Sequence, residues 1–142
     1  MNRLLFGLLL TMSMTCHAVE WRLLSPNSNG TSFYIDLETS EQDGNIRRLW
    51  IMENRTKSRM VEGKRILSAI VFKAYDCKVR RSQSLSGTYY SGRMGHGKVL
   101  YVFEEKEDAA QFDRIVPGTF AEQIINEVCL DSWLNPASKI KM

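Results

Sequence analysis

The feature that most constrains the fold is a stretch of twelve residues, 66–77, with the sequence ILSAIVFKAYDC. It is rich in Ile, Val, Phe and Tyr and contains no glycine or proline, which predicts a long β-strand. Apolar side chains occupy both alternating faces of this strand, so it is expected in the middle of a sheet rather than at an edge. The strand ends at Cys77, and a short amphipathic segment near the C-terminus ends at Cys129. We therefore expect a sheet with a covering helix.

The N-terminal residues have the layout of a secretory signal peptide. Arg3 provides a basic start, an apolar run covers residues 4–12, and small residues precede Val19. We predict a signal peptide over residues 1–18, cleaved between Ala18 and Val19. The apolar run is shorter than the roughly 20 residues that a membrane-spanning helix needs, so no transmembrane span is expected.

Cys16 offers an alternative, in which it becomes a lipid-modified N-terminal residue. A bacterial lipobox has an aliphatic residue three positions before the cysteine and Gly, Ala or Ser directly before it, whereas these places hold Ser13 and Thr15. A lipid anchor at Cys16 is therefore disfavoured. The expected location is the periplasm or the outer-membrane surface.

The predicted export determines whether the cysteines are expected to form a disulfide. The sequence contains three cysteines, and removal of residues 1–18 leaves Cys77 and Cys129 in an oxidising compartment, which favours one disulfide. Two buried free thiols are the alternative. A metal site is less favoured because neither cysteine has a nearby Cys or His partner.

Size and charge indicate one domain with an uneven charge distribution. A chain of 142 residues with 44% hydrophobic residues suits a single core. We expect a domain over residues 19–132 and a flexible tail over 133–142. The formal charge of +3 hides a basic middle third and an acidic C-terminal third. Such asymmetry can attract a polyanionic partner or pair two copies in a homodimer, and a solvated sheet face is the plain alternative.

The remaining pattern predicts an α+β fold in a single domain, with about six antiparallel strands packed by one C-terminal helix. Expected strands cover residues 19–24, 31–36, 45–54, 66–77, 78–85 and 98–103, and the helix covers 120–130. Thr119 and Glu122 predict a capping box at the start of this helix. We expect a helical turn and loop over 37–44, a flexible charged connector over 55–65, and a glycine-rich hairpin loop over 91–97.

The sequence offers no recognisable reactive centre. His96 is the one histidine after the predicted signal peptide, and no nucleophile motif accompanies it. There is no HxxxH, CxxC or calcium-type acidic loop, so neither a metal nor a cofactor is expected. The glycine-rich loop opens no helix and lacks the lysine of a phosphate-binding loop. We therefore predict that the chain is not an enzyme.

Several segments together resemble one known family. They are FYID, the DGN turn leading into RRLWIMEN, the YDC triplet, the loop YYSGRMGHG at residues 89–97, and VPGTFAEQIINEVC ending at Cys129. Over nearly all of the chain after the signal peptide, this pattern is similar to the surface-adhesin protein E family of Gram-negative bacteria. The resemblance implies a six-stranded antiparallel sheet and a C-terminal helix held by a Cys77–Cys129 disulfide. It also implies an exported protein that binds host extracellular-matrix and serum proteins.

These observations lead to three functional hypotheses. The first is an exported binding module that recognises a protein or polyanionic macromolecule of the host or the envelope, and not a nucleic acid. Its candidate contact residues are Arg47, Arg48, Arg80, Arg81, Tyr89, Tyr90 and Arg93. The second is a periplasmic small-molecule or haem-type carrier that uses His96, Met94 and the adjacent tyrosines. The third is a periplasmic enzyme, for which the sequence supplies no nucleophile or metal set. A structural role in the envelope is a further alternative to the first hypothesis.

Overall fold

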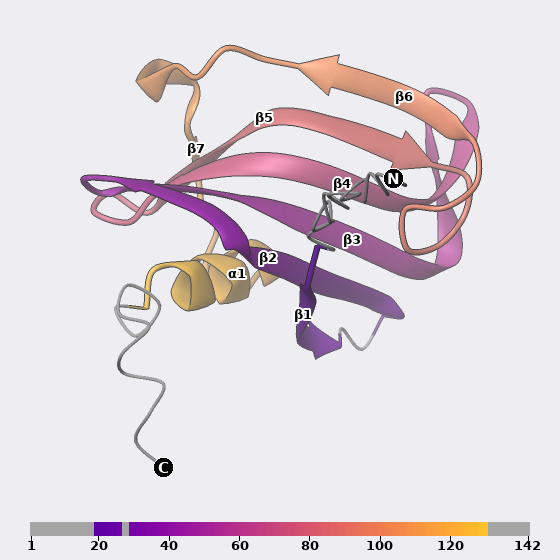
Figure 1. Ribbon diagram of the computed structural model, residues 1–142, viewed down its shortest axis with the longest axis horizontal. Helices are drawn as coiled ribbons and strands as arrows, with labels where there is room; N and C mark the ends of the chain where they lie inside the picture. Colours follow the sequence, from indigo (N-terminus) through magenta and orange to yellow (C-terminus); the bar gives the residue numbers. More distant parts are fainter. Residues whose placement is uncertain (1–18, 27–28, 131–142) are drawn as a thin grey trace, which may run out of the picture.

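The computed structural model describes residues 19–26 and 29–130 (Figure 1). The predicted signal peptide, its cleavage after Ala18 and the predicted tail over 133–142 lie outside these residues or at their border. Within the described part of the chain, no helix has the length and apolar character needed to cross a bilayer.

One antiparallel sheet dominates the molecule, with strands in the order β1-β2-β3-β4-β5-β6. Its strands are β1 (Trp21–Pro26), β2 (Thr31–Asp43), β3 (Ile46–Val61), β4 (Lys64–Asp76), β5 (Arg81–Tyr90) and β6 (Val99–Glu104). The remaining elements are a 3-10 turn η1 (Ala109–Gln111), the short strand β7 (Asp113–Arg114), which pairs with β5, and the helix α1 (Phe120–Val128). The predicted fold class and the inner position of the 66–77 strand are both confirmed.

Two segments predicted to be irregular are strands instead. β2 continues to Asp43, with a bulge after Asp36 whose carboxylate accepts hydrogen bonds from the backbone N–H groups of Glu38 and Thr39. The predicted connector over 55–65 is a β-hairpin that turns at Glu62 and Gly63, both of which have positive φ. Both segments are polar and were therefore not predicted as strands, although solvent-exposed strand ends tolerate charged side chains.

Several boundaries also differ from the prediction; β5, for example, ends at Tyr90 rather than at residue 85. β5 begins at Arg81 rather than at residue 78, because the Asp76 carboxylate accepts hydrogen bonds from the N–H groups of Lys78 and Val79 and closes a turn there. α1 ends at Val128, two residues earlier than expected.

The predicted capping box is wrong. Thr119 is the N-cap residue, but its hydroxyl donates to the Val116 carbonyl instead of capping the helix. The Glu122 carboxylate accepts from the N–H of Gly118, one residue before the expected donor.

The main core lies between α1 and one face of the sheet. Ile125 and Val128 of the helix are buried against Ile35, Leu49 and Tyr75 from three neighbouring strands. Because the apolar residues of α1 recur at helical spacing, they form one stripe that faces the sheet. Burial of the Tyr75 hydroxyl raises its pKa.

The opposite face is covered at one end by the segment that follows β6. Phe112 packs on Ala74 and Leu85 in a second buried cluster. The Gln83 side chain donates to the Lys106 carbonyl and accepts from the N–H of Asp108, which fixes this segment to β5. The chain then crosses the end of the sheet through β7 to reach α1 (Figure 1).

Candidate binding surfaces

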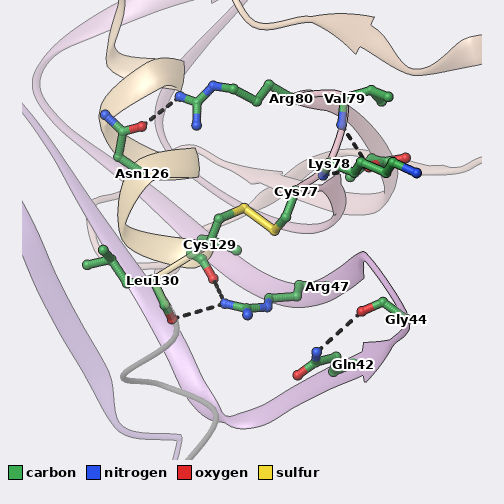
Figure 2. The surroundings of a disulfide bond; sticks show 12 residues. Gln42, Gly44, Arg47, Cys77, Lys78, Val79, Arg80, Asn126, Cys129 and Leu130 are labelled. Atoms are coloured by element: carbon green, nitrogen blue, oxygen red, sulfur yellow. Dashed lines mark hydrogen bonds between the residues drawn. A yellow bond between two sulfur atoms is a disulfide. The ribbon is translucent and has the colours of Figure 1, made fainter.

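The disulfide and two arginines fasten α1 to the sheet. Cys77 and Cys129 are bonded, with their Cα atoms 5.6 Å apart, so the predicted pairing is confirmed (Figure 2). Arg47 of β3 donates to the carbonyls of Val128 and Leu130 at the end of α1. These carbonyls have no partner inside the helix, and a cation beside them also complements the helix dipole.

Arg80 fastens the helix from the other side of the disulfide. Its Nη2 atom donates to Oδ1 of Asn126 at 2.6 Å (Figure 2). Arg80 itself sits in the turn before β5 with a φ of 56°. The two candidate contact residues nearest the disulfide, Arg47 and Arg80, therefore already contribute to holding α1 in place.

Arg48 lies on the sheet face opposite to Arg47. Its Nε and Nη2 atoms donate to the two carboxylate oxygens of Glu107 at 2.6 and 2.7 Å. This paired geometry is the strong form of an arginine–carboxylate contact. The hydrogen bonds from Arg48 lower the pKa of Glu107 and raise that of Arg48. Arg48 therefore fixes the segment after β6 against the sheet.

Tyr89 and Tyr90 are adjacent in β5, so they point to opposite faces. The Tyr89 ring lies on the face that carries α1, in a part of the sheet that the helix does not reach. Its centroid is 5.8 Å from that of Tyr101 and 6.2 Å from that of Phe103. The guanidinium carbon of Arg59 lies 5.8 Å from the centroid of Tyr89.

Tyr90 lines a hollow of about 340 Å³ on the opposite face. The other lining residues include Trp21, Asp36, Trp50, Ile70 and Thr88. Asp36 is almost fully buried, and its carboxylate already accepts hydrogen bonds within β2. The hollow is therefore mainly aromatic and apolar.

The glycine-rich loop at residues 91–97 is a fixed structure rather than a loose connector. The Ser68 hydroxyl donates to the Gly92 carbonyl at 2.6 Å and accepts from the N–H of Gly95 at 2.9 Å. Oδ1 of Asn54 accepts from the N–H of Met94 at 2.8 Å. The loop exposes His96 and Arg93. His96 and Met94 do not line the aromatic hollow, and the described residues contain no cluster of metal-ligating side chains.

The β3–β4 hairpin brings together cations that the sequence analysis had placed in a flexible connector. Its cations are Arg55, Lys57, Arg59, Lys64 and Arg65. Nζ of Lys64 donates to the Leu100 carbonyl at 3.0 Å, which places the hairpin turn beside β6. The turn lies at the end of the sheet away from α1 (Figure 1). The sequence did contain one signal for this hairpin, the Glu62-Gly63 pair between two segments of similar length.

Arg81 is the remaining candidate, and it is separated from the hairpin by the length of β5. It starts this strand, where it lies opposite Arg114 of β7. The seven candidates therefore occupy both faces and both ends of the sheet. Arg93 and Tyr89 lie at the hairpin end, and Arg80 and Arg81 lie at the α1 end.

A single antiparallel sheet, one covering helix and one disulfide define a small disulfide-bonded α+β domain. The model of the surface-adhesin protein E family matches residues 21–130, so the chain belongs to that family. No curated protein shows a significant match to the sequence.

Solved structures of Haemophilus influenzae protein E are similar in fold. Crystal form II has 19% sequence identity and a TM-score of 0.57, with 77% of this chain and 86% of that chain covered. Another structure of the same protein has 19% identity and a TM-score of 0.56, with 81% and 87% covered. At this identity the likeness establishes the fold.

Proposed function

We propose that this family member is an exported, non-catalytic adhesin that binds a macromolecular partner through the hairpin end of the sheet. The contact region, here called the hairpin surface, consists of Tyr89, Tyr101, Phe103, Arg55, Arg59 and Lys64. In this proposal residues 1–18 act as a cleaved signal peptide and residues 19–132 form the binding domain.

One observation carries the proposal: an arginine lies over a tyrosine in a patch of rings that the helix leaves uncovered. Tyr101 is 42% exposed, and Arg59 lies above the neighbouring Tyr89. Tyrosine and arginine are the side chains that most often dominate binding energy at protein interfaces. The rings are already packed together, so little side-chain freedom is lost on binding.

The charge of the hairpin surface favours an acidic protein as the partner. Glu53 is paired with Arg55 and lies 3.9 Å from Arg59, so it offsets only part of the local positive charge. The surrounding cations would speed the encounter with an acidic surface. β6 is an edge strand with Val99 and Val102 exposed, so it can also accept an extended partner segment. Host matrix or serum proteins and envelope proteins fit this description.

The test uses the purified chain and a panel of immobilised extracellular-matrix and serum proteins. The variant R59Q/Y101S should weaken binding to the recognised protein by about tenfold or more, since each such contact contributes about 1 kcal/mol or more. R81Q, at the other end of the sheet, is the matched control and should bind as the wild type does. Unchanged binding by R59Q/Y101S would contradict the proposal.

Three companion measurements test the remaining parts of the proposal. Mass spectrometry of the protein recovered from fractionated cells distinguishes a chain that starts at Val19 from one acylated at Cys16, and protease treatment of whole cells separates surface exposure from a periplasmic location. Light scattering across a concentration series reveals whether exposed β6 pairs two copies into a homodimer instead. A homodimer that buries Tyr101 would remove the hairpin surface as a partner site.

A second candidate function, small-molecule carriage, is favoured by the aromatic hollow around Trp50 and Tyr90. A ligand held there should raise the unfolding temperature of the wild type. The shift should disappear in Y90A. Because His96 does not line this hollow, haem added as a probe should behave alike with the wild type and H96A.

A further inference from the structure

Two arginines face each other where the sheet ends near α1. Arg81 of β5 and Arg114 of β7 are direct partners in an antiparallel pair. Directly opposed residues project from the same side of a sheet, and like charges in this arrangement destabilise the pairing. β7 is only two residues long, so the repulsion falls on a weak element of the fold.

A third arginine and an open hollow adjoin this pair. Arg80, Arg81 and Arg114 line a hollow of about 700 Å³ together with Val79, Pro117 and Glu122. Arg80 donates to Asn126, a neutral acceptor. Ile115 completes the lining, and its N–H donates to the Arg80 carbonyl at 3.4 Å. We name this site the arginine hollow.

The positive charge of the arginine hollow is only partly compensated. In the part of the chain that the structure describes, no ion pair engages Arg81 or Arg114. Asp76 is the cross-strand neighbour of Arg81 on β4; its Oδ1 accepts from the N–H groups of Lys78 and Val79, and its charge offsets part of that of Arg81. Glu122 is the one carboxylate in the lining, and it accepts a hydrogen bond from Gly118. The lining therefore carries three arginines and one carboxylate, with Asp76 next to Arg81.

We propose that the arginine hollow binds the sulfate or carboxylate groups of an acidic oligosaccharide. Guanidinium groups bind planar or tetrahedral oxyanions through paired hydrogen bonds. The hollow is much larger than one oxyanion and lies in the size range of small-molecule sites. A sugar ring combines apolar C–H faces with charged substituents, which complements exposed Val79 and Pro117 beside the three arginines.

This inference is independent of the proposed protein-binding role. The arginine hollow is lined from β7 and the start of β5, which lie at the α1 end of the sheet, whereas the β3–β4 turn of the hairpin surface lies at the opposite end (Figure 1). Variants at one site therefore leave the other intact. Loss of saccharide binding and loss of protein binding can be scored separately in the same preparations.

The test measures calorimetric binding of the purified chain to a sulfated tetrasaccharide derived from heparin. The same tetrasaccharide without sulfate, inorganic sulfate and a hexaglutamate peptide are the comparison probes. R81Q/R114Q should weaken binding of the sulfated probe by about tenfold or more, because it removes two charge-assisted contacts. R59Q/Y101S, altered at the hairpin surface, should bind this probe as the wild type does.

Two further variants guard against a trivial loss of structure. E122Q retains a side-chain acceptor for Gly118 but removes the negative charge, so it should bind the sulfated probe several-fold more tightly than the wild type. R114Q without ligand should unfold at a temperature about 2 °C higher at low salt, because it relieves the opposed charges. If the arginines only stabilised the fold, neither the tighter binding of E122Q nor the higher unfolding temperature of R114Q would be expected.

Three results would overturn the proposal. The first is equal affinity of R81Q/R114Q and the wild type for the sulfated tetrasaccharide. The second is a tetrasaccharide affinity no higher than that for inorganic sulfate, which would reduce the site to one for single ions. The third is tighter, R81Q/R114Q-sensitive binding of hexaglutamate, which would assign the hollow to acidic peptides instead.

Discussion

Removal of the Cys77–Cys129 disulfide tests how the helix is held. The bridge joins residues 52 positions apart. The chain-entropy relation gives a loss of about 14 cal/mol/K for closing a loop of that length, which is about 4 kcal/mol at 25 °C. A domain of this size has a stability of roughly 5–15 kcal/mol. The variant C77S/C129S should therefore stay folded at 25 °C while losing a large share of its stability.

The assay is urea unfolding followed by circular dichroism, with the wild type in oxidised and reduced form beside C77S/C129S. Both disulfide-free samples should have a lower unfolding midpoint and a steeper dependence of free energy on urea, since their denatured chains are less constrained. The native spectrum should be unchanged, because Ile125, Val128 and Arg47 still fix α1 to the sheet.

A stability loss below about 1 kcal/mol, at an unchanged urea dependence, would refute this reasoning. It would mean that the bridge does not constrain the denatured chain as calculated. Loss of the helical signal in native buffer would refute the other half of the reasoning, that packing and the Arg47 contacts hold α1 without the bridge. The variant R47Q, which keeps the disulfide, separates the two contributions.

Three other perturbations have expected outcomes. Hydrogen bonds from Arg48 lower the pKa of Glu107 in the folded protein. Their contribution to stability is therefore present above the unfolded pKa of about 4.3 and is lost as the pH falls through the folded pKa. In urea unfolding at pH 2 to 7, the free energies of unfolding of the wild type and E107Q should converge in acid. Burial lowers the pKa of Lys73, so its charged form is disfavoured by the fold at neutral pH, and K73M should raise the free energy of unfolding by about 1 kcal/mol in the same assay. A Cβ on Gly87 would lie 2.6 Å from the Phe103 ring, so G87A should lower the free energy of unfolding by about 1–3 kcal/mol and with it the unfolding temperature. G63S should also destabilise the fold, but only because residue 63 has a positive φ.

The central strand, the sheet class and the disulfide could be predicted from the sequence because each depends on strong local signals. An apolar run without glycine or proline admits few structures, and the predicted removal of Cys16 leaves two cysteines with one possible pairing. The hairpin over 55–65 was not predicted because its turn places Glu62 at positive φ, where this residue type is seldom found. The extension of β2 to Asp43 was not predicted because an exposed strand end lacks the alternation of apolar and polar residues that marks a half-buried strand.

The binding residues were harder to place because charge alone does not reveal partners. Arg48 and Glu107 are 59 positions apart, and only the fold brings them together. Likewise, Arg47 reaches the end of α1 across 81 positions. Sequence reasoning therefore grouped arginines that the structure distributes between helix attachment, sheet contacts and open surface. The opposition of Arg81 and Arg114 depends on the β5–β7 register, which no local pattern indicates.

The central claim is that the uncovered rings and the basic hairpin form the partner-binding surface. The most direct measurement compares the wild type, R59Q/Y101S and R81Q for binding to an immobilised panel of matrix and serum proteins at two salt concentrations. The account predicts that the wild type and R81Q bind the same protein, more weakly at high salt, and that R59Q/Y101S loses about tenfold or more in affinity. Equal binding by all three proteins, or binding insensitive to salt, would contradict it.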